Sequence, residues 1–225
     1  TNYTKPSQKM TISGWIASAA GQWGPLINSW MAGQGTGASG QFQLEVVPDV
    51  PNNTINLQCQ IEVGPNKVLT SGAVDVSFDE FPPFIFHHFA MTANGLTLSI
   101  YWDGLLVSSV DYLGSINAGP FTWLSMGANL TGDPVNNPGS ALAGGTFPGR
   151  IDDVAMWNRS LSAAEIAAVY VAGLAGIGVG SVPPILTPPL DIAQTPAGIV
   201  ISWPPELTSF ILESTPRLEG TPVWT

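Results

Sequence analysis

The chain contains 225 residues, which is enough for a sizeable core and for one or two domains. Only 10% of the residues are charged, and 16 acidic against 6 basic residues give a net charge of −10, which argues against binding to nucleic acid or anionic lipid through a basic patch. No apolar run reaches the length of a transmembrane helix and no signal-peptide pattern opens the chain, so we expect a soluble protein without membrane insertion.

The first part of the chain predicts two strands followed by a loop. Met10 to Ala17 forms the first clear strand after a polar lead-in, and Leu26 to Ala32 forms the second. Trp23 lies in the turn region between them, where its ring either packs or stacks on a sugar. Gly33 to Gly40 predicts a flexible loop, because glycine is unfavourable in a strand, and it lacks the lysine of a phosphate-binding loop. Five tryptophans lie on predicted strands and are expected in the core: Trp15, Trp30, Trp102, Trp123 and Trp157.

The next two predicted strands carry a row of polar side chains. Gln41 to Val47 and Ile55 to Val63 alternate apolar and polar residues and are joined by a turn at Pro51-Asn52-Asn53. Cys59 belongs to the apolar set, so we expect a buried thiol, and a single cysteine cannot form an internal disulfide. The polar side is either a solvated outer face or a surface whose amides and carboxylates bind sugar hydroxyls. Its members on the second strand are Asn56, Gln58, Gln60 and Glu62.

A further strand pair, or a strand and a loop, is predicted from Val68 to Phe78. The nearest cluster of carboxylates follows it, at Asp75, Asp79 and Glu80, before a pair of prolines. A glycoside hydrolase needs two carboxylates that face a cleft, whereas these lie at a strand end. We therefore predict no catalytic residues, no cofactor-binding residues and no enzyme activity.

A three-stranded antiparallel meander is predicted between Phe86 and Asp111. Its turns are Asn94-Gly95 and Asp103-Gly104, the strongest short-range hairpin signals. In the middle strand one face consists of Leu96, Leu98, Ile100 and Trp102. His87 and His88 are neighbours in a strand and must point to opposite faces, so they cannot chelate one metal ion together.

Another strand is predicted from Phe121 to Asn129, followed by a long loop from Thr131 to Gly145. Long rim loops are where sandwich domains often bind ligands. This loop offers polar groups for a sugar at Asp133, Asn136 and Asn137, and with Trp23 these are the candidate ligand-binding residues. The alternative is that the loops merely connect strands.

The last strand of the domain is predicted from Arg150 to Asn158. Asp152-Asp153 interrupts the alternation of apolar and polar residues in this strand. In a regular strand Ile151 and Val154 would point to opposite faces although both are apolar, and this predicts a bulge. A capping box at Ser162 to Glu165 then begins a helix through about Leu174. Apolar residues at helical spacing should dock this helix, namely Ile166, Val169, Tyr170 and Leu174, and Gly173 and Gly176 should end it.

Three segments resemble the concanavalin A-like, laminin-G-like jelly-roll domains of secreted bacterial proteins. They are Met10 to Ile16, Phe86 to Ser109, and Phe147 to Ser162. The resemblance implies an all-β antiparallel sandwich with one C-terminal helix, over residues 1–176, and a chain that begins inside this domain. It also implies a structural calcium ion, for which Asp152 and backbone carbonyls would be ligands. In the alternative, Asp152 caps a turn or pairs with Arg159.

The remainder divides into a linker and a second segment. Residues 177–190 are rich in Gly and Pro and predict an extended linker. Asp191 to Thr225 resembles the first strands of fibronectin-III or immunoglobulin-like domains but is too short for a complete one. We expect it to pair with another chain or to belong to a longer polypeptide.

Two functions are consistent with these features. The first is a non-catalytic carbohydrate-binding or adhesion module of a secreted or cell-surface bacterial protein, with glycans or neighbouring domains as partners. The second is a structural spacer or a subunit of an extracellular assembly. A glycoside hydrolase is the least favoured reading, and a jelly roll by itself specifies no function.

Overall fold

The computed structural model describes residues 8–18, 24–30, 40–77, 85–118, 124–130, 145–181, 191–195 and 198–202. The chain divides into two compact units, Thr1–Pro183 and Pro184–Thr225, and each is described by itself. Among the described residues, no helix is long and apolar enough to cross a membrane.

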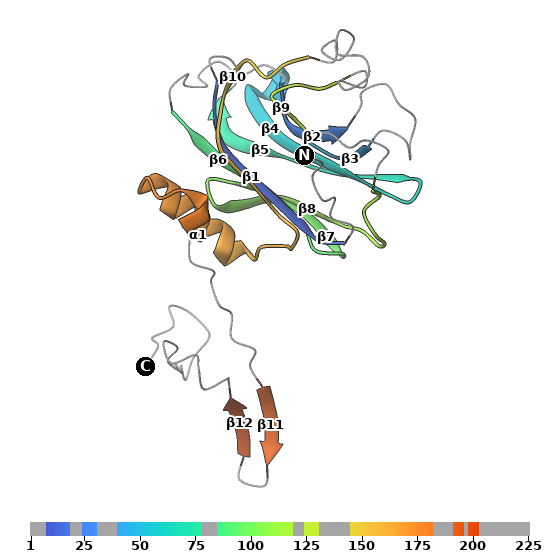
Figure 1. The fold of residues 1–225 in the computed structure, drawn as a ribbon, viewed down its shortest axis with the longest axis vertical. Coiled ribbons are helices and arrows are strands. Elements are labelled where there is room, and N and C mark those ends of the chain that lie inside the picture. The colour runs from blue at the N-terminus through green and yellow to red at the C-terminus, as the bar shows by residue number, and fades with distance from the viewer. Residues whose placement is uncertain are drawn as a thin grey trace. The chain divides into compact units, whose positions relative to one another are not determined.

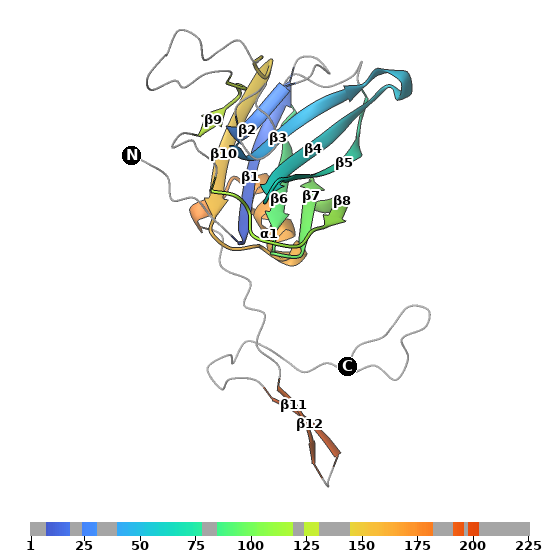
Figure 2. The same cartoon turned by 90° about the vertical axis from the view of Figure 1, so that its right-hand side faces the viewer.

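The first unit is a sandwich of two five-stranded antiparallel sheets, whose layers are visible in Figure 1 and whose strands are spread side by side in Figure 2. This confirms the all-β jelly-roll prediction. Sheet 1 has the order β10 (Gly149–Trp157), β1 (Met10–Ser18), β6 (His87–Ala93), β7 (Thr97–Trp102) and β8 (Leu105–Asp111). Sheet 2 has the order β5 (Asn66–Ser77), β4 (Thr54–Val63), β3 (Gly40–Asp49), β2 (Gly24–Trp30) and β9 (Ser125–Met126).

The core lies between the two sheets and is built from the alternate residues of each strand that face inward. Phe42 and Leu44 of β3 face it together with Leu57 of β4, and all three are fully buried. Cys59 is also fully buried there, as predicted, and burial raises the pKa of its thiol. The alternation seen in the sequence therefore predicted the inner faces correctly.

The meander β6–β7–β8 forms as predicted, and its turns explain its register. Asp103 and Gly104 have φ values of 46° and 79°, the left-handed conformation that a two-residue hairpin turn needs. At the other turn the Asn94 side chain accepts hydrogen bonds from the N–H groups of Leu96 and Thr97. Leu96 was expected to face the core, but it lies in this turn and is 64% exposed.

The next two segments settle how many strands they hold. Of the two alternatives for the segment after Val68, the strand pair is wrong, because this segment is one strand, β5. Within residues 124–130 only β9 is a strand, so the prediction of a strand through Asn129 was wrong. The turn predicted at residues 51–53 is a short 3-10 helix, η1 (Val50–Asn52), closed by Asn53 in the left-handed conformation.

Helix α1 (Ala163–Leu174) covers the outer face of sheet 1. Its start is the predicted capping box: Ser162 Oγ accepts from the Glu165 N–H, and the Glu165 carboxylate accepts from the Ser162 N–H at 2.8 Å. Ile166 and Val169 are buried against the sheet, whereas Leu174 is 63% exposed, contrary to prediction. Gly173 lies inside the helix rather than ending it. The chain leaves the helix at Gly176, with φ +70°, and a 3-10 turn, η3 (Val179–Ser181), follows.

The predicted bulge in β10 is confirmed. Ser13 pairs with Ala155 and Trp15 pairs with Asp152, so one more residue lies on β10 than on β1 between these pairs. Asp153 is the extra residue, because it has a left-handed φ of 44° while Val154 packs against the core. Asp152 is thereby directed to the outer face, beside Trp15.

The second unit contains β11 (Asp191–Thr195) and β12 (Gly198–Ser202), which form an antiparallel hairpin. The immunoglobulin-like prediction for this segment, and its pairing with another chain, stay predictions.

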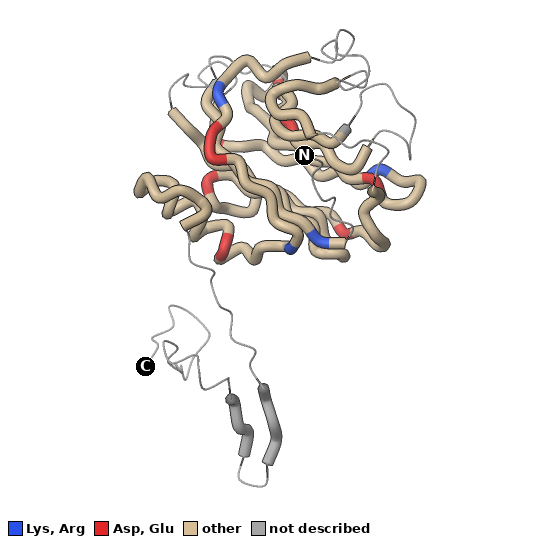
Figure 3. Tube along the Cα trace, viewed as in Figure 1, with Lys and Arg blue, Asp and Glu red and all other residues tan. Residues whose placement is uncertain are grey.

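Figure 3 shows that Lys and Arg are few and scattered among the described residues. This distribution agrees with the absence of a basic stripe in the sequence.

Candidate functional site

Four of the five residues predicted for a ligand or metal lie outside the described residues. These are Trp23, Asp133, Asn136 and Asn137, together with most of both predicted rim loops. The fifth, Asp152, is exposed on β10 and lines a cleft. The structure therefore offers two other places to look for a site, namely this cleft and the outer face of sheet 2.

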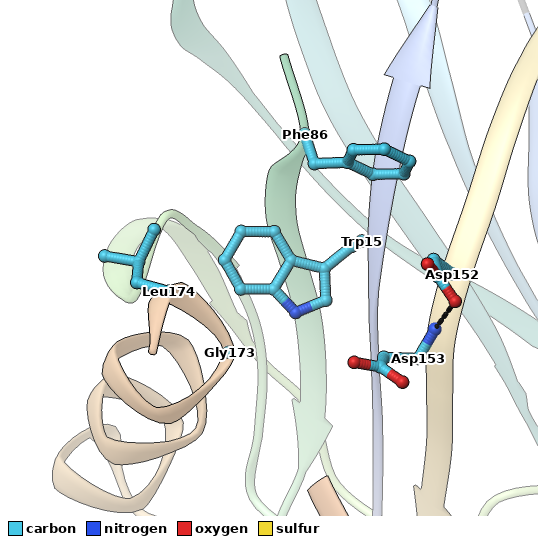
Figure 4. A pocket seen from close by; sticks show the side chains of 6 residues that line it. All are labelled: Trp15, Phe86, Asp152, Asp153, Gly173 and Leu174. Atoms are coloured by element: carbon cyan, nitrogen blue, oxygen red, sulfur yellow. Dashed lines mark hydrogen bonds between the residues drawn. The ribbon is translucent and has the colours of Figure 1, made fainter. Parts of the chain in front are cut away.

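The cleft lies beside the C-terminal end of α1 and has a volume of about 310 Å3 (Figure 4). We call it the helix-end cleft. Aromatic rings from β1 and from the residue before β6 line it together with two carboxylates of β10 and the last residues of the helix. The lining residues are Trp15, Phe86, Asp152, Asp153, Gly173 and Leu174.

Trp15 is the central side chain of the helix-end cleft and is only 9% exposed. Its ring stacks on Tyr170 of α1, with centroids 5.7 Å apart, and meets His88 of β6 edge-on at 5.3 Å. Trp15 was expected in the core between the sheets but faces the helix instead. The alternation of β1 contained this signal, because Trp15 has the parity of Thr11 and Ser13, opposite to Ile12 and Ile16.

Gly173 allows the helix to approach this tryptophan closely. A Cβ at this position would lie 2.4 Å from Trp15 Cζ2 and 2.8 Å from Trp15 Nε1. Only glycine therefore permits the present distance between ring and helix.

The two carboxylates of the helix-end cleft have few partners. Asp152 Oδ1 accepts a hydrogen bond from the Asp153 N–H at 2.9 Å, and neither side chain has an ion-pair partner among the described residues. The alternative in which Asp152 pairs with Arg159 is not formed, because Arg159 pairs with Glu165 at 2.8 Å.

The side-chain donors of the cleft among the described residues are two carboxylates. Calcium takes about six to eight oxygen ligands, so backbone carbonyls and water would have to supply the others, and Asp152 Oδ1 already accepts a hydrogen bond from the backbone. In the described part of the chain, no group of three or more His, Cys, Asp or Glu side chains is placed to hold a metal ion. Calcium binding by Asp152 stays a prediction.

The two histidines point to opposite faces, as expected. His87 stacks on Trp102, and its Nδ1 lies 2.7 Å from Asp103 Oδ2. His88 is fully buried under α1, and neither ring nitrogen has a hydrogen-bond partner within the part of the chain that the structure describes. Burial lowers the pKa of His88 to about 4, although the Asp103 charge acts in the opposite direction. His88 is therefore a neutral packing residue near pH 7.

The second place is a hydrogen-bonded row of side chains on the outer face of sheet 2, which we call the amide row: Gln43 and Glu45 of β3 with Gln58 and Gln60 of β4. Glu45 and Gln58 are cross-strand partners, as are Gln43 and Gln60. Gln43 donates to Glu45 Oε2 and Gln58 donates to Glu45 Oε1, each at 2.8 Å, while Gln60 donates to Gln43.

This network fixes which atoms point outward. The Glu45 carboxylate can only accept, so both neighbouring amides must turn their NH2 groups toward it. The side-chain carbonyl oxygens of Gln58 and Gln60 accept no hydrogen bond among the described residues. The exposed edge of the amide row is thus rich in acceptors.

The burial of the amide row differs from a simple solvated face. Across sheet 2, Leu69 of β5 is 46% exposed, Gln58 and Gln60 of β4 are half-buried, and Gln43 of β3 is 4% exposed. The expectation of a solvated outer face is therefore wrong for β3 and for Glu62 of β4, which is fully buried, and it is correct only toward β5. Alternation predicted the row, but nothing in the sequence predicted its burial.

A family model described as the concanavalin A-like lectin/glucanases superfamily matches residues 1–167. A comparison with curated protein sequences gives no match. Among solved structures, the native heptameric SAP-like pentraxin from Limulus polyphemus has a TM-score of 0.56 at 15% identity, covering 89% of this chain and 85% of the pentraxin. The Ruminococcus gnavus IT-sialidase CBM40 bound to alpha2,3 sialyllactose has a TM-score of 0.51 at 13% identity, covering 73% and 83%. At these low identities, the two structural matches show a shared fold.

Proposed function

Because the chain belongs to the concanavalin A-like lectin/glucanases superfamily, we propose that it is a non-catalytic carbohydrate-binding module of a secreted or cell-surface bacterial protein. The observation that carries the proposal is the amide row. Gln58 donates to the buried Glu45 carboxylate, and Gln60 donates to Gln43, which itself donates to Glu45, so the free acceptors of both half-buried glutamines are fixed in place. A fixed row of acceptors suits the hydroxyl groups of a sugar.

The favoured ligand is a neutral glycan. The only charge in the amide row is the Glu45 carboxylate, and the whole chain has a net charge of −10, so an anionic sugar would meet repulsion. The solved CBM40 is named with sialyllactose bound, which supports glycan binding on this fold but does not transfer its anionic ligand to this chain.

A glycan array followed by affinity electrophoresis tests this proposal. Gln58→Met with Gln60→Met keeps the side-chain length but removes the acceptors, and should abolish retention. Asn66→Ala, at an exposed amide on β5 of the same sheet, should bind like the parent chain. Shortening residues 131–144 tests the rim-loop prediction that includes Asp133 and Asn136. If only that shortening abolishes binding, the site is in the loops rather than on the sheet.

The second candidate function is a subunit or spacer in an extracellular assembly. The observation that favours it is a set of exposed leucines on and beyond β8, the edge strand of sheet 1: Leu105 at 73%, Leu106 at 57% and Leu113 at 87%. Exposed apolar groups on and beyond an edge strand suit contact with another domain. This function would be favoured if the parent chain retains no glycan and if it self-associates in a way that Leu105→Lys removes.

A further inference from the structure

The helix-end cleft concentrates negative charge that the described residues do not neutralise. Asp152 and Asp153 both line it, and neither has an ion-pair partner among those residues. Figure 4 shows the two carboxylates on β10, across the cleft from Leu174. A ligand that approaches from solvent therefore meets two unpaired carboxylates on one wall.

The opposite wall is the C-terminal end of α1, which adds to the same field. The aligned peptide dipoles of a helix place roughly half a negative charge at its C-terminus. The last turn of α1 contains no basic residue that would offset this charge. The helix end and the β10 carboxylates thus favour a cation between them.

The aromatic side chains of the cleft favour a cation that also carries apolar groups. The faces of Trp and Phe rings attract ammonium and guanidinium groups, most strongly when the ring is shielded from water. Trp15 contacts the rings of Tyr170 and His88 and is 9% exposed, and Phe86 is half-buried beside it. The Trp15 Nε1–H has no hydrogen-bond partner among the described residues and could donate to a ligand carbonyl.

We propose that the helix-end cleft binds an organic cation, an ammonium group on a short alkyl chain, as in a lysine side chain or a small free amine. The carboxylates and the helix end hold the charge, and the rings contact the alkyl groups. A volume of about 310 Å3 fits a group of this size. A hard metal ion would gain nothing from the two rings, and a neutral sugar would leave the carboxylate charges unpaired. This site lies on sheet 1 and is independent of the glycan proposal.

The test is a titration of the 15N-labelled chain, with the Trp15 indole signal assigned by its loss in Trp15→Phe. The buffer is low in salt and contains EDTA, so that calcium is excluded. Nα-acetyl-lysine N-methylamide should shift the Trp15 signal saturably, and its uncharged analogue, Nα-acetyl-norleucine N-methylamide, should bind at least about tenfold more weakly. Equal binding of the two compounds, or no shift with either, overturns the proposal.

A charge-removing variant identifies the carboxylates as the cause. Asp152→Asn with Asp153→Asn should weaken lysine-amide binding by at least about tenfold, because asparagine keeps the shape and tolerates the left-handed conformation of residue 153. Asp111→Asn, at an exposed carboxylate of β8, is the matched control and should bind like the parent chain. Unchanged affinity in the double variant, with an unchanged melting temperature, overturns the proposal.

A second pair of probes distinguishes the source of the cation. If the cleft accepts a lysine side chain from another protein, a capped tetrapeptide with lysine at its second position should bind at least as tightly as n-butylammonium. If it accepts a free amine, n-butylammonium should shift the Trp15 signal and the tetrapeptide should not. Failure of both probes overturns the proposal and leaves the glycan test unaffected.

Discussion

Replacement of Gly173 by alanine tests how tightly α1 is fitted to the tryptophan beneath it. The added Cβ would lie 2.4 Å from Trp15 Cζ2, so the ring or the helix must move by about 1 Å to restore a normal contact. The ring has little room to retreat, because it stacks on Tyr170 at 5.7 Å and meets His88 at 5.3 Å. The methyl group therefore overpacks this interface.

Two opposing terms set the magnitude. Gly→Ala inside an unobstructed helix stabilises by about 1 kcal/mol. Overpacking a rigid contact costs about 1 to 3 kcal/mol. We expect Gly173→Ala to lower the free energy of unfolding by about 1 kcal/mol, which corresponds to roughly 2 to 4 °C in melting temperature for a chain of this size.

A double-mutant cycle measured by urea unfolding isolates the clash. With Trp15→Ala in the background, the same Gly173→Ala change should become stabilising by about 1 kcal/mol, giving a coupling of about 2 kcal/mol. Gly178→Ala is the control, because a Cβ there meets no atom within 4 Å. A stabilising Gly173→Ala in the parent background, or no coupling to Trp15, would refute the reasoning.

Three further predictions concern charged or titrating groups. The folded-state pKa of His88 is about 4, below its ordinary value of 6.5. Its contribution to the free energy of unfolding should therefore be complete above pH 6.5 and fall by about 3 kcal/mol by pH 4. In urea unfolding, His88→Phe should lose correspondingly less stability over this pH range. Asp103→Ala removes an acceptor of the His88 N–H and replaces a residue at φ 46°, so it should cost about 2 to 3 kcal/mol. Asp103→Asn should cost about half as much, and equal losses in the two variants would contradict this account. Because two carboxylates are few for calcium, EDTA should leave the melting temperature unchanged. A melting temperature that EDTA lowers and calcium restores, with no such effect in Asp152→Asn, would support the calcium prediction.

Local chemistry explains why much of the fold could be predicted from the sequence. Asn94-Gly95 and Asp103-Gly104 determine turns through backbone conformations that few other residues adopt. The capping box at Ser162 marks the start of α1 through two hydrogen bonds within four residues. Both signals are short-range, so no tertiary information was needed to interpret them.

The helix-end cleft could not be predicted in the same way, because it depends on contacts between distant segments. Trp15 and Gly173 are far apart in the chain, and only the packing of α1 on sheet 1 brings them together. Leu174 matched a helical apolar pattern but lines the helix-end cleft and is 63% exposed. The burial of Gln43 likewise depends on tertiary structure, which alternation within one strand does not report.

The bulge in β10 has a consequence for how this strand can vary among related chains. Without Asp153 the strand would alternate regularly, because Ile151, Val154 and Met156 would then fall on one face, the face they already occupy. The extra residue is thus a one-residue insertion that the core does not require. Related chains that lack it should align with a single gap at this position and keep the same core residues. Their outer face would then carry one acidic residue fewer beside the tryptophan, so such chains should present a weaker negative charge in the helix-end cleft.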